Sequence, residues 1–171
     1  MKNYQHILER KNEVLRIQQT KSGHLTRQDM QDASTNRWAK YPNFDRIVHF
    51  SPREFHCKCA KCKNRRGAEN VKYKLLAALD DMRHIIGQPI IVTSGYRCKE
   101  HSRESSKRTP GGHYRGVAVD ISMWDAGIRH LYLEWILKNN QFQRIGIAKK
   151  FLHLQITDEK QPLDAIWSYQ R

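Results

Sequence analysis

The chain has 171 residues, with 31 Lys and Arg against 17 Asp and Glu, and a net charge of +14 at pH 7. Charged residues make up 28% and hydrophobic residues 39%, which excludes a disordered tail and predicts one soluble globular domain with an appendage. No apolar run approaches the ~18 residues that a membrane helix needs, and the N-terminus lacks the apolar stretch of a signal peptide. We therefore expect synthesis in the cytoplasm and no membrane span.

The N-terminal quarter differs from the rest in its patterning. Apolar residues recur at helical spacing over residues 4–18, which predicts a short amphipathic helix with a thin apolar face. Residues 19–45 are polar and show no period, which is typical of a loop. We therefore divide the chain into a helix-plus-loop extension, residues 1–45, and a main domain, residues 46–171.

Helix signals dominate the first half of the main domain. Ser51 fits a helix cap, with Pro52 at the first position and Glu54 reaching back to the cap. Residues 71–86 carry six apolar residues on one face and are predicted to form the clearest helix, capped by Asn70 and ending at Gly87.

The second half mixes strands and one helix. Residues 90–93 and 117–121 have the composition of buried strands, and a polar loop at residues 99–112 lies between them. A helix is expected over residues 126–138, followed by a hairpin of strands near 144–148 and 151–156. This irregular mixture predicts an α+β fold, a small antiparallel sheet with flanking helices.

Two histidines and one aspartate stand out as candidate metal ligands. His113 follows two glycines, Asp120 ends a predicted strand, and His153 lies in the middle of another. Two imidazoles and a carboxylate are a frequent catalytic zinc set, with a fourth position left for water whose pKa the metal lowers to about 7. The chain has nine histidines, and a single histidine is more often surface or packed core, so composition alone says little.

The sequence motifs around these three residues make the metal-site prediction specific. Their order and spacing resemble the zinc D-Ala-D-Ala carboxypeptidase and L-Ala-D-Glu endopeptidase family over roughly residues 47–169. Many members are phage endolysins, and the Hedgehog signalling domain shares the fold. The resemblance rests on Ser94-Gly95-Tyr96-Arg97-Cys98, on Gly112-His113-Tyr114-Arg115-Gly116-Val117-Ala118-Val119-Asp120-Ile121, and on Phe151-Leu152-His153-Leu154.

The resemblance implies roles for particular residues. His113, Asp120 and His153 match the zinc ligands, and Arg97 matches a residue that grips the substrate carboxylate or polarises its carbonyl. A guanidinium suits that task because it offers two parallel hydrogen bonds, although a surface ion pair is the plainer interpretation. The implied activity is a phage-encoded zinc peptidase that cleaves peptidoglycan stem peptides. Trp167 and Tyr169 are expected to pack against the sheet.

The sequence departs from the family where a general base is needed. The family commonly has a carboxylate three residues before the last ligand, where this chain has Lys150, or two residues after it, where this chain has Gln155. A glutamine orients water but cannot accept a proton, so Asp158 is the first substitute to consider, with Glu159 beside it. The family's usual serine is replaced by Gly112.

The four cysteines admit three interpretations. Cys57, Cys59 and Cys62 are compact in sequence, and Cys98 follows Arg97. They could bind a second, structural zinc ion, form a disulfide to Cys98, or remain free thiols. For the metal interpretation, a nearby histidine could replace one thiol.

Three functions follow from these features. The leading one is the zinc peptidase, which would act at the cell wall. The second is a catalytically weak or inactive zinc-binding domain that serves as a virion or cell-wall-binding component and contacts virion proteins through residues 1–45. The third is a nucleic-acid binder built on the basic cysteine segment, a partner that we do not expect.

Overall fold

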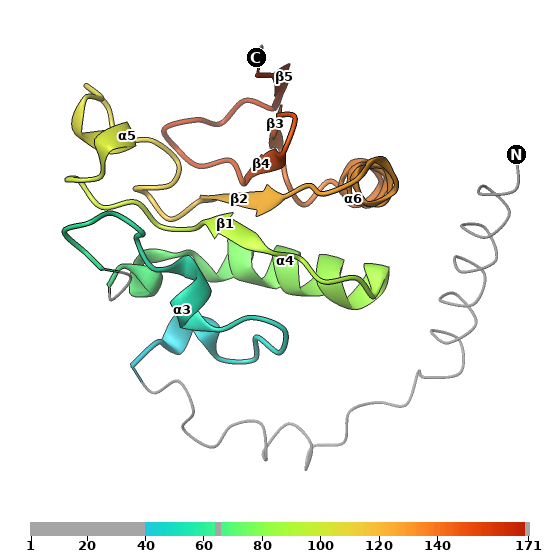
Figure 1. Cartoon of the computed structure of the whole chain (residues 1–171), viewed down its shortest axis with the longest axis horizontal. Coiled ribbons are helices and arrows are strands. Elements are labelled where there is room, and N and C mark those ends of the chain that lie inside the picture. Colours follow the sequence, from blue (N-terminus) through green and yellow to red (C-terminus); the bar gives the residue numbers. More distant parts are fainter. Residues whose placement is uncertain (1–39, 64–65, 170–171) are drawn as a thin grey trace, which may run out of the picture.

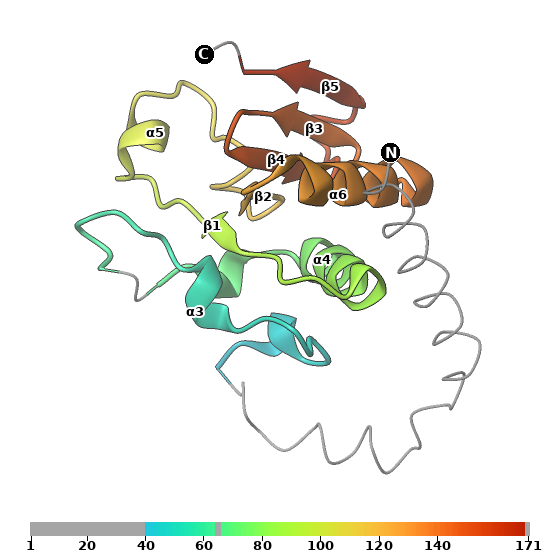
Figure 2. The same cartoon turned by 45° about the vertical axis from the view of Figure 1, so that its right-hand side comes forward.

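Short strands with alternating side chains build a five-stranded sheet through the middle of the protein. The computed structural model describes residues 40–63 and 66–169. In the sheet the strand order is β1-β2-β4-β3-β5 (Figures 1 and 2). The strands are β1 Val92–Ser94, β2 Ala118–Ser122, β3 Arg144–Ile147, β4 Phe151–Gln155 and β5 Ala165–Ser168.

The predicted α+β class is confirmed, and the sheet is antiparallel along most of its width. Strand β2 pairs antiparallel with β1 and β4, and β4 pairs antiparallel with β3. The edge strand β5, which sequence reasoning did not assign as a strand, runs parallel to β3 and makes the sheet mixed.

Two long helices cover one face of the sheet. They are α4 Tyr73–Ile86 and α6 Ala126–Asn139, and they pack against each other. Alternate residues of the central strands point toward them into one core, and Figure 1 shows α6 on one side of the sheet and α5 with its loops on the other. The strand residues in that core are Val119, Ile121, Ile145, Leu152 and Leu154.

The helix ends follow the predicted capping residues with one exception. The short helix α3, Pro52–Phe55, has the predicted capping box between Ser51 and Glu54. Helix α4 ends at Gly87, whose left-handed backbone (φ 65°) suits glycine. It begins two residues later than predicted, because residues 68–70 form the separate turn η2, Ala68–Asn70, and Val71 is extended.

Two other predicted segments differ in detail. The strand predicted at residues 90–93 is β1, at the edge of the sheet, and Ile91 is 53% exposed. Successive side chains of a strand point to opposite faces, and only one face of this sheet packs against the two long helices, so burial alternates where a continuous buried run was expected. The polar loop at residues 99–112 contains a single helical turn, α5, Ser102–Ser105.

The segment before residue 46 packs on the domain. The turn η1, Pro42–Phe44, places Phe44 in the core, and its ring lies 5.5 Å from that of Phe55 in an edge contact. Asn43 donates to the carbonyls of Ala68 and Val71. The boundary drawn at residue 45 therefore falls within a packed segment, because Phe44 needs burial. The helix expected at 4–18 lies outside the described residues, and the division into extension and domain stays a prediction.

The helices in the described part of the chain do not cross a membrane, since none is both long and apolar enough to do so.

Candidate active site

One row of residues crosses the sheet from edge to edge on the face opposite the helices. Asp120 of β2 pairs with His153 of β4, and His153 pairs in turn with Gly146 of β3. Ser94 and Trp167 end the row on β1 and β5. Because Val119 and Ile121 point into the core, Asp120 between them points to the other face, as does His153 between Leu152 and Leu154. The period-2 pattern of the strands thus places the predicted ligands together.

The three predicted metal ligands converge on one point. His113 comes from the turn before β2, and its Nε2 lies 3.1 Å from Asp120 Oδ1 and 3.2 Å from His153 Nδ1. His153 Nδ1 lies 2.8 Å from the same carboxylate oxygen. All three side chains are buried. The structure therefore brings together the ligand set that the sequence predicted.

The hydrogen bonds of His113 fix which ring nitrogen is available to a cation. Its Nδ1 donates to the carbonyl of Gly95 at 2.7 Å, and since a carbonyl only accepts, the proton of the neutral ring lies on Nδ1. The lone pair of Nε2 then points at Asp120 and His153. Nitrogen and oxygen donors held this way fit a zinc ion, which prefers them at about 2.0–2.2 Å. The donor set therefore fits the metal that the sequence predicted.

Electrostatics keep these ligands in the form that binds metal. Burial lowers the pKa of His113, which keeps the imidazole neutral. Burial alone would raise the pKa of Asp120, but the two imidazoles beside its carboxylate outweigh burial and hold that pKa below its usual range. A neutral imidazole and an ionised carboxylate are the forms that coordinate a cation.

Arg97 lies beside the metal ligands. Its Nη2 donates to Asp120 Oδ2, the oxygen that does not face the histidines, and its Nε donates to Ser94 Oγ at 2.9 Å. The pair is almost fully buried, with side-chain exposures of 11% and 10%. The surface ion pair considered for Arg97 is therefore wrong in its location, since the guanidinium is packed against a ligand inside the site.

Gln155 lies in the same cleft as His153, two residues along β4. Its Nε2 donates to Gln161 Oε1 at 2.6 Å, and that oxygen also accepts from Arg115. A Cβ atom placed on Gly112 would lie only 2.3 Å from Gln155 Oε1. The two departures from the family pattern are therefore in contact, because the glycine leaves the space that the longer glutamine occupies.

Asp158, the substitute base, is held by another partner. Arg115 donates to both of its carboxylate oxygens, with Nε at 2.6 Å and Nη2 at 3.2 Å. Burial would raise its pKa, but these bonds lower it. In the described chain, Asp120 is the one carboxylate residue that lines the cleft. Asp158 is thus placed in a structural ion pair, and its role as a base stays a prediction.

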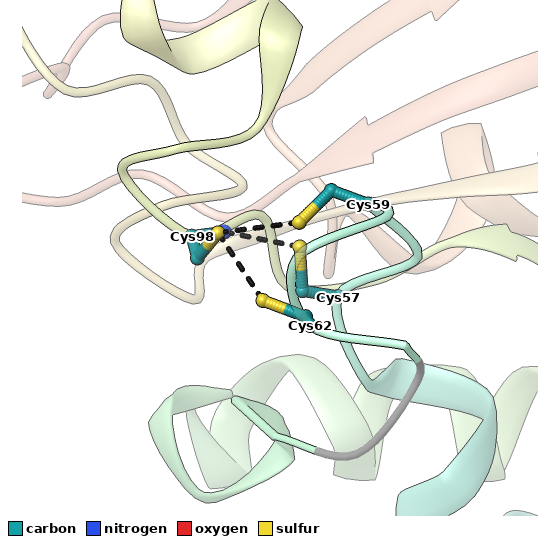
Figure 3. A group of neighbouring side chains, drawn as sticks. All are labelled: Cys57, Cys59, Cys62 and Cys98. Atoms are coloured by element: carbon teal, nitrogen blue, oxygen red, sulfur yellow. Dashed lines mark hydrogen bonds between the residues drawn. The ribbon is translucent and has the colours of Figure 1, made fainter.

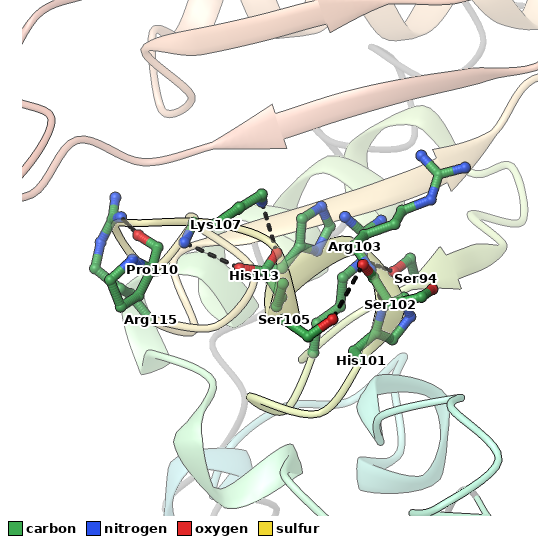
Figure 4. Close-up of polar contacts among 12 residues, drawn as sticks. Ser94, His101, Ser102, Arg103, Ser105, Lys107, Pro110, His113 and Arg115 are labelled. Atoms are coloured by element: carbon green, nitrogen blue, oxygen red, sulfur yellow. Dashed lines mark hydrogen bonds and ion pairs between the residues drawn. The ribbon is translucent and has the colours of Figure 1, made fainter.

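The cleft above the ligands has a volume of about 830 Å³ and strongly basic walls. Its cations come from the loop around α5, from β3 and from the β3–β4 turn, and Figure 4 shows the loop residues with their polar contacts. The sequence predicted a polar loop at residues 99–112 but did not assign its cations to the site. The basic residues that line the cleft are Arg97, Arg103, Lys107, Arg144, Lys149 and Lys150.

Aromatic side chains from β5 close one wall of the cleft. The ring of Trp167 lies 5.5 Å from that of His153, and Tyr169 also lines the cleft. A Cβ atom on Gly146 would lie 2.8 Å from both aromatic rings, so only glycine leaves room for them. The two aromatics pack against the sheet as predicted, and they also face the site.

Comparison with known families matches this region. A profile of the family described as Peptidase M15 matches residues 48–155, which include the three ligands, Arg97, Gln155 and all four cysteines. Comparison with curated proteins gives no match.

Proposed function

Because the chain belongs to the Peptidase M15 family, we propose that it is a zinc-dependent peptidase that hydrolyses peptide bonds in peptidoglycan stem peptides. The observation that carries the proposal is the meeting of His113 Nε2, His153 Nδ1 and Asp120 Oδ1 at the floor of an accessible cleft. Three protein ligands beside a cleft are the arrangement of a catalytic zinc site, whereas structural sites are closed by four.

The walls of the cleft suit an anionic peptide. Stem peptides carry free carboxylates, and the cations around the cleft attract such a substrate and speed its arrival. Arg144 also holds Trp167 at its rim, with the guanidinium carbon 5.8 Å from the ring centroid. These contacts favour a carboxylate-bearing peptide chain over a neutral one.

Each residue of the proposed site has a separate role in peptide hydrolysis. A zinc ion held by His113, Asp120 and His153 would polarise the scissile carbonyl and lower the pKa of a bound water to about 7. Arg97, fixed by Asp120 and Ser94, presents a positive charge where the carbonyl oxygen gains negative charge. The Gln155 amide forms a hydrogen bond with the attacking water. This bond orients the water but does not remove a proton from it.

The missing base supports a second candidate function. Because Asp120 is the one described carboxylate lining the cleft and is committed to Arg97 and the histidines, no other acidic side chain there is positioned to take a proton. A zinc-binding domain that is catalytically weak or inactive, and that binds the cell wall, therefore remains the alternative. Phage origin, an endolysin role, contacts with virion proteins and carboxypeptidase specificity stay predictions.

The test is turnover of purified peptidoglycan by the full chain. We expect slow release of new amino or carboxyl termini, detected by mass spectrometry of soluble fragments, and its loss in His113→Ala. His130→Ala is the matched control, because this exposed histidine lies on α6 and is absent from the cleft lining. Zinc content of one or more per chain with no turnover in wild type or in Gln155→Glu would favour the binding domain. Equal turnover in His113→Ala and wild type would overturn the peptidase proposal.

A further inference from the structure

Four cysteine side chains from two distant segments meet at the edge of the domain. Cys57, Cys59 and Cys62 lie on the loop that follows α3, and Cys98 lies directly after Arg97. All four Sγ atoms are within 4.8 Å of one another, with Cys62 Sγ at 3.3 Å and Cys59 Sγ at 3.6 Å from Cys98 Sγ (Figure 3). All four thiols are free.

We propose that these four cysteines bind a second zinc ion, with a structural role. Zinc–sulfur bonds of about 2.3 Å in a tetrahedron place the sulfurs roughly 3.8 Å apart, close to the spacing seen here. Four sulfurs would fill all four positions of the tetrahedron. Cys57, Cys62 and Cys98 are buried, and Cys59 is partly exposed. Four protein ligands and a closed site are the features that separate structural from catalytic zinc.

Hydrogen bonds to the sulfurs favour thiolates over a disulfide. The backbone N–H of Cys98 donates to Cys57 Sγ at 3.3 Å, and Arg66 Nε donates to Cys62 Sγ at 3.0 Å. Sulfur is a weak acceptor unless it carries negative charge, so donors aimed at two of the four sulfurs point to anionic ligands. Zinc with four thiolates carries a net charge of −2. Arg66 and Lys61 lie at the same rim and share the carboxylate of Glu100, so together these three side chains leave one positive charge to offset part of it.

Neighbouring histidines are engaged elsewhere, which leaves sulfur as the ligand type. His56 Nδ1 accepts from the backbone N–H of Ala68, and its Nε2 bonds to the Tyr41 hydroxyl. His101 Nδ1 accepts from the N–H of Arg103 at the start of α5. A site that combines these histidines with three thiols would require both local structures to change.

The ion would tie the loop after α3 to the segment that carries Arg97. That segment is already bonded to α3, because Tyr96 N donates to the carbonyl of Phe55 at 2.9 Å. The backbone hydrogen bond at Tyr96 and the ion at Cys98 would together hold the Gly95–Cys98 segment against α3 and the loop that follows it. This site lies outside the proposed peptidase site and does not depend on its activity.

The test is the zinc content of full-length protein purified with zinc and a reducing agent, measured by mass spectrometry of the metal. We expect two ions per chain in wild type, one in His113→Ala and one in Cys62→Ser. X-ray absorption at the zinc edge of His113→Ala should show a shell of sulfur at about 2.3 Å, without nitrogen or oxygen. Addition of a strong chelator should lower the melting temperature of that variant.

The outcomes separate this proposal from the peptidase proposal. A zinc-free His113→Ala, a sulfur shell that also contains nitrogen or oxygen, or a mass showing a disulfide that persists in protein purified with zinc and reducing agent would overturn the cysteine site. If the peptidase site instead fails to bind, His113→Ala and wild type would hold the same single ion in a sulfur shell. Should Cys62→Ser fail to fold, the spectrum of His113→Ala still decides.

Discussion

The His113–Asp120–His153 site and the four-cysteine cluster are joined at adjacent residues, Arg97 and Cys98, yet they are built in opposite ways. The first takes Asp120 and His153 from two paired strands and His113 from the turn before β2, mixes nitrogen and oxygen donors, and opens to a basic cleft. The second rests on loops, offers sulfur alone, and has three of its four cysteines buried. Regular strands hold ligands at fixed spacing while leaving one side accessible, whereas loops can wrap around an ion from all sides. The difference teaches that one short domain can place an open and a buried group of candidate metal ligands side by side.

Removal of a ligand from the His113–Asp120–His153 site should abolish hydrolysis and leave the four-cysteine cluster unchanged. His113→Ala leaves two ligands and should abolish peptidoglycan hydrolysis, because two side chains hold zinc weakly. The alkylation of cysteines by iodoacetamide, followed by mass spectrometry, should be unchanged from wild type. Faster alkylation would mean that the two centres are not independent.

The second expected effect is a gain of activity at Gln155. Gln155→Glu places a carboxylate beside the proposed water, and a general base contributes roughly 10²–10⁴-fold to the rate. Initial rates on purified peptidoglycan fragments would measure the gain. Asp158→Asn is the comparison: if Gln155→Glu changes nothing and Asp158→Asn abolishes activity, Asp158 is the base after all.

Arg97 should matter for the open site alone, although it adjoins Cys98. Arg97→Met removes a charge that stabilises the developing oxyanion, and loss of one such donor costs about 10²–10³ in kcat. Arg97→Lys keeps the charge but loses the fork that holds Asp120 and Ser94, so it should recover only part of the rate. Zinc content should remain that of wild type in both variants, and its loss would assign Arg97 a structural role.

Because Gly112 and Gln155 are in contact, substitutions at the two positions should have non-additive effects on the free energy of unfolding. Gly112→Ser adds a Cβ that would lie 2.3 Å from Gln155 Oε1, so it should lower stability in wild type. In a Gln155→Asp background the shorter side chain relieves the clash, and the coupling should reach about 0.5–3 kcal/mol. Urea unfolding of the four chains measures it, and additive effects would contradict the contact.

The smallest effect concerns the ion pair outside the cleft. Asp158→Asn should lower the free energy of unfolding by about 1–2 kcal/mol at pH 7, because Arg115 loses a charged partner. The pKa of Asp158 is lowered in the folded state, so this contribution is present above its unfolded value of about 3.9 and is lost as pH falls through the folded pKa. Wild type and variant should therefore converge in acid, and a constant difference at all pH values would contradict the ion pair.

The ligands could be predicted because the short motifs around them resemble those of a zinc peptidase family. A strand places alternate residues on one face, so Asp120 and His153 needed only the correct pairing of β2 with β4 to meet. The cleft walls could not be predicted in this way. Trp167 lies at the site because β5 pairs in parallel with β3. That pairing joins segments far apart in the sequence, and the four residues of β5 do not predict it.

The assembly of the cysteine cluster also could not be predicted from local sequence. The spacing of Cys57, Cys59 and Cys62 marks them as neighbours, but nothing local brings Cys98 to them. Its approach depends on the backbone bond from Tyr96 to Phe55 and on Gly95, whose Cβ would lie 2.5 Å from the backbone of Phe55. Close backbone approach of this kind is a property of the folded chain.

The position of the four cysteines has a consequence for the order in which the protein is made. All of them lie between residues 57 and 98, whereas Asp120 and His153 come later. A growing chain therefore carries the complete sulfur ligand set out of the ribosome before any of strands β2 to β5 exists. If the cysteines bound an ion at that stage, the N-terminal half would be fixed first, and strands β2 to β5, with Asp120 and His153, would pack onto it afterwards.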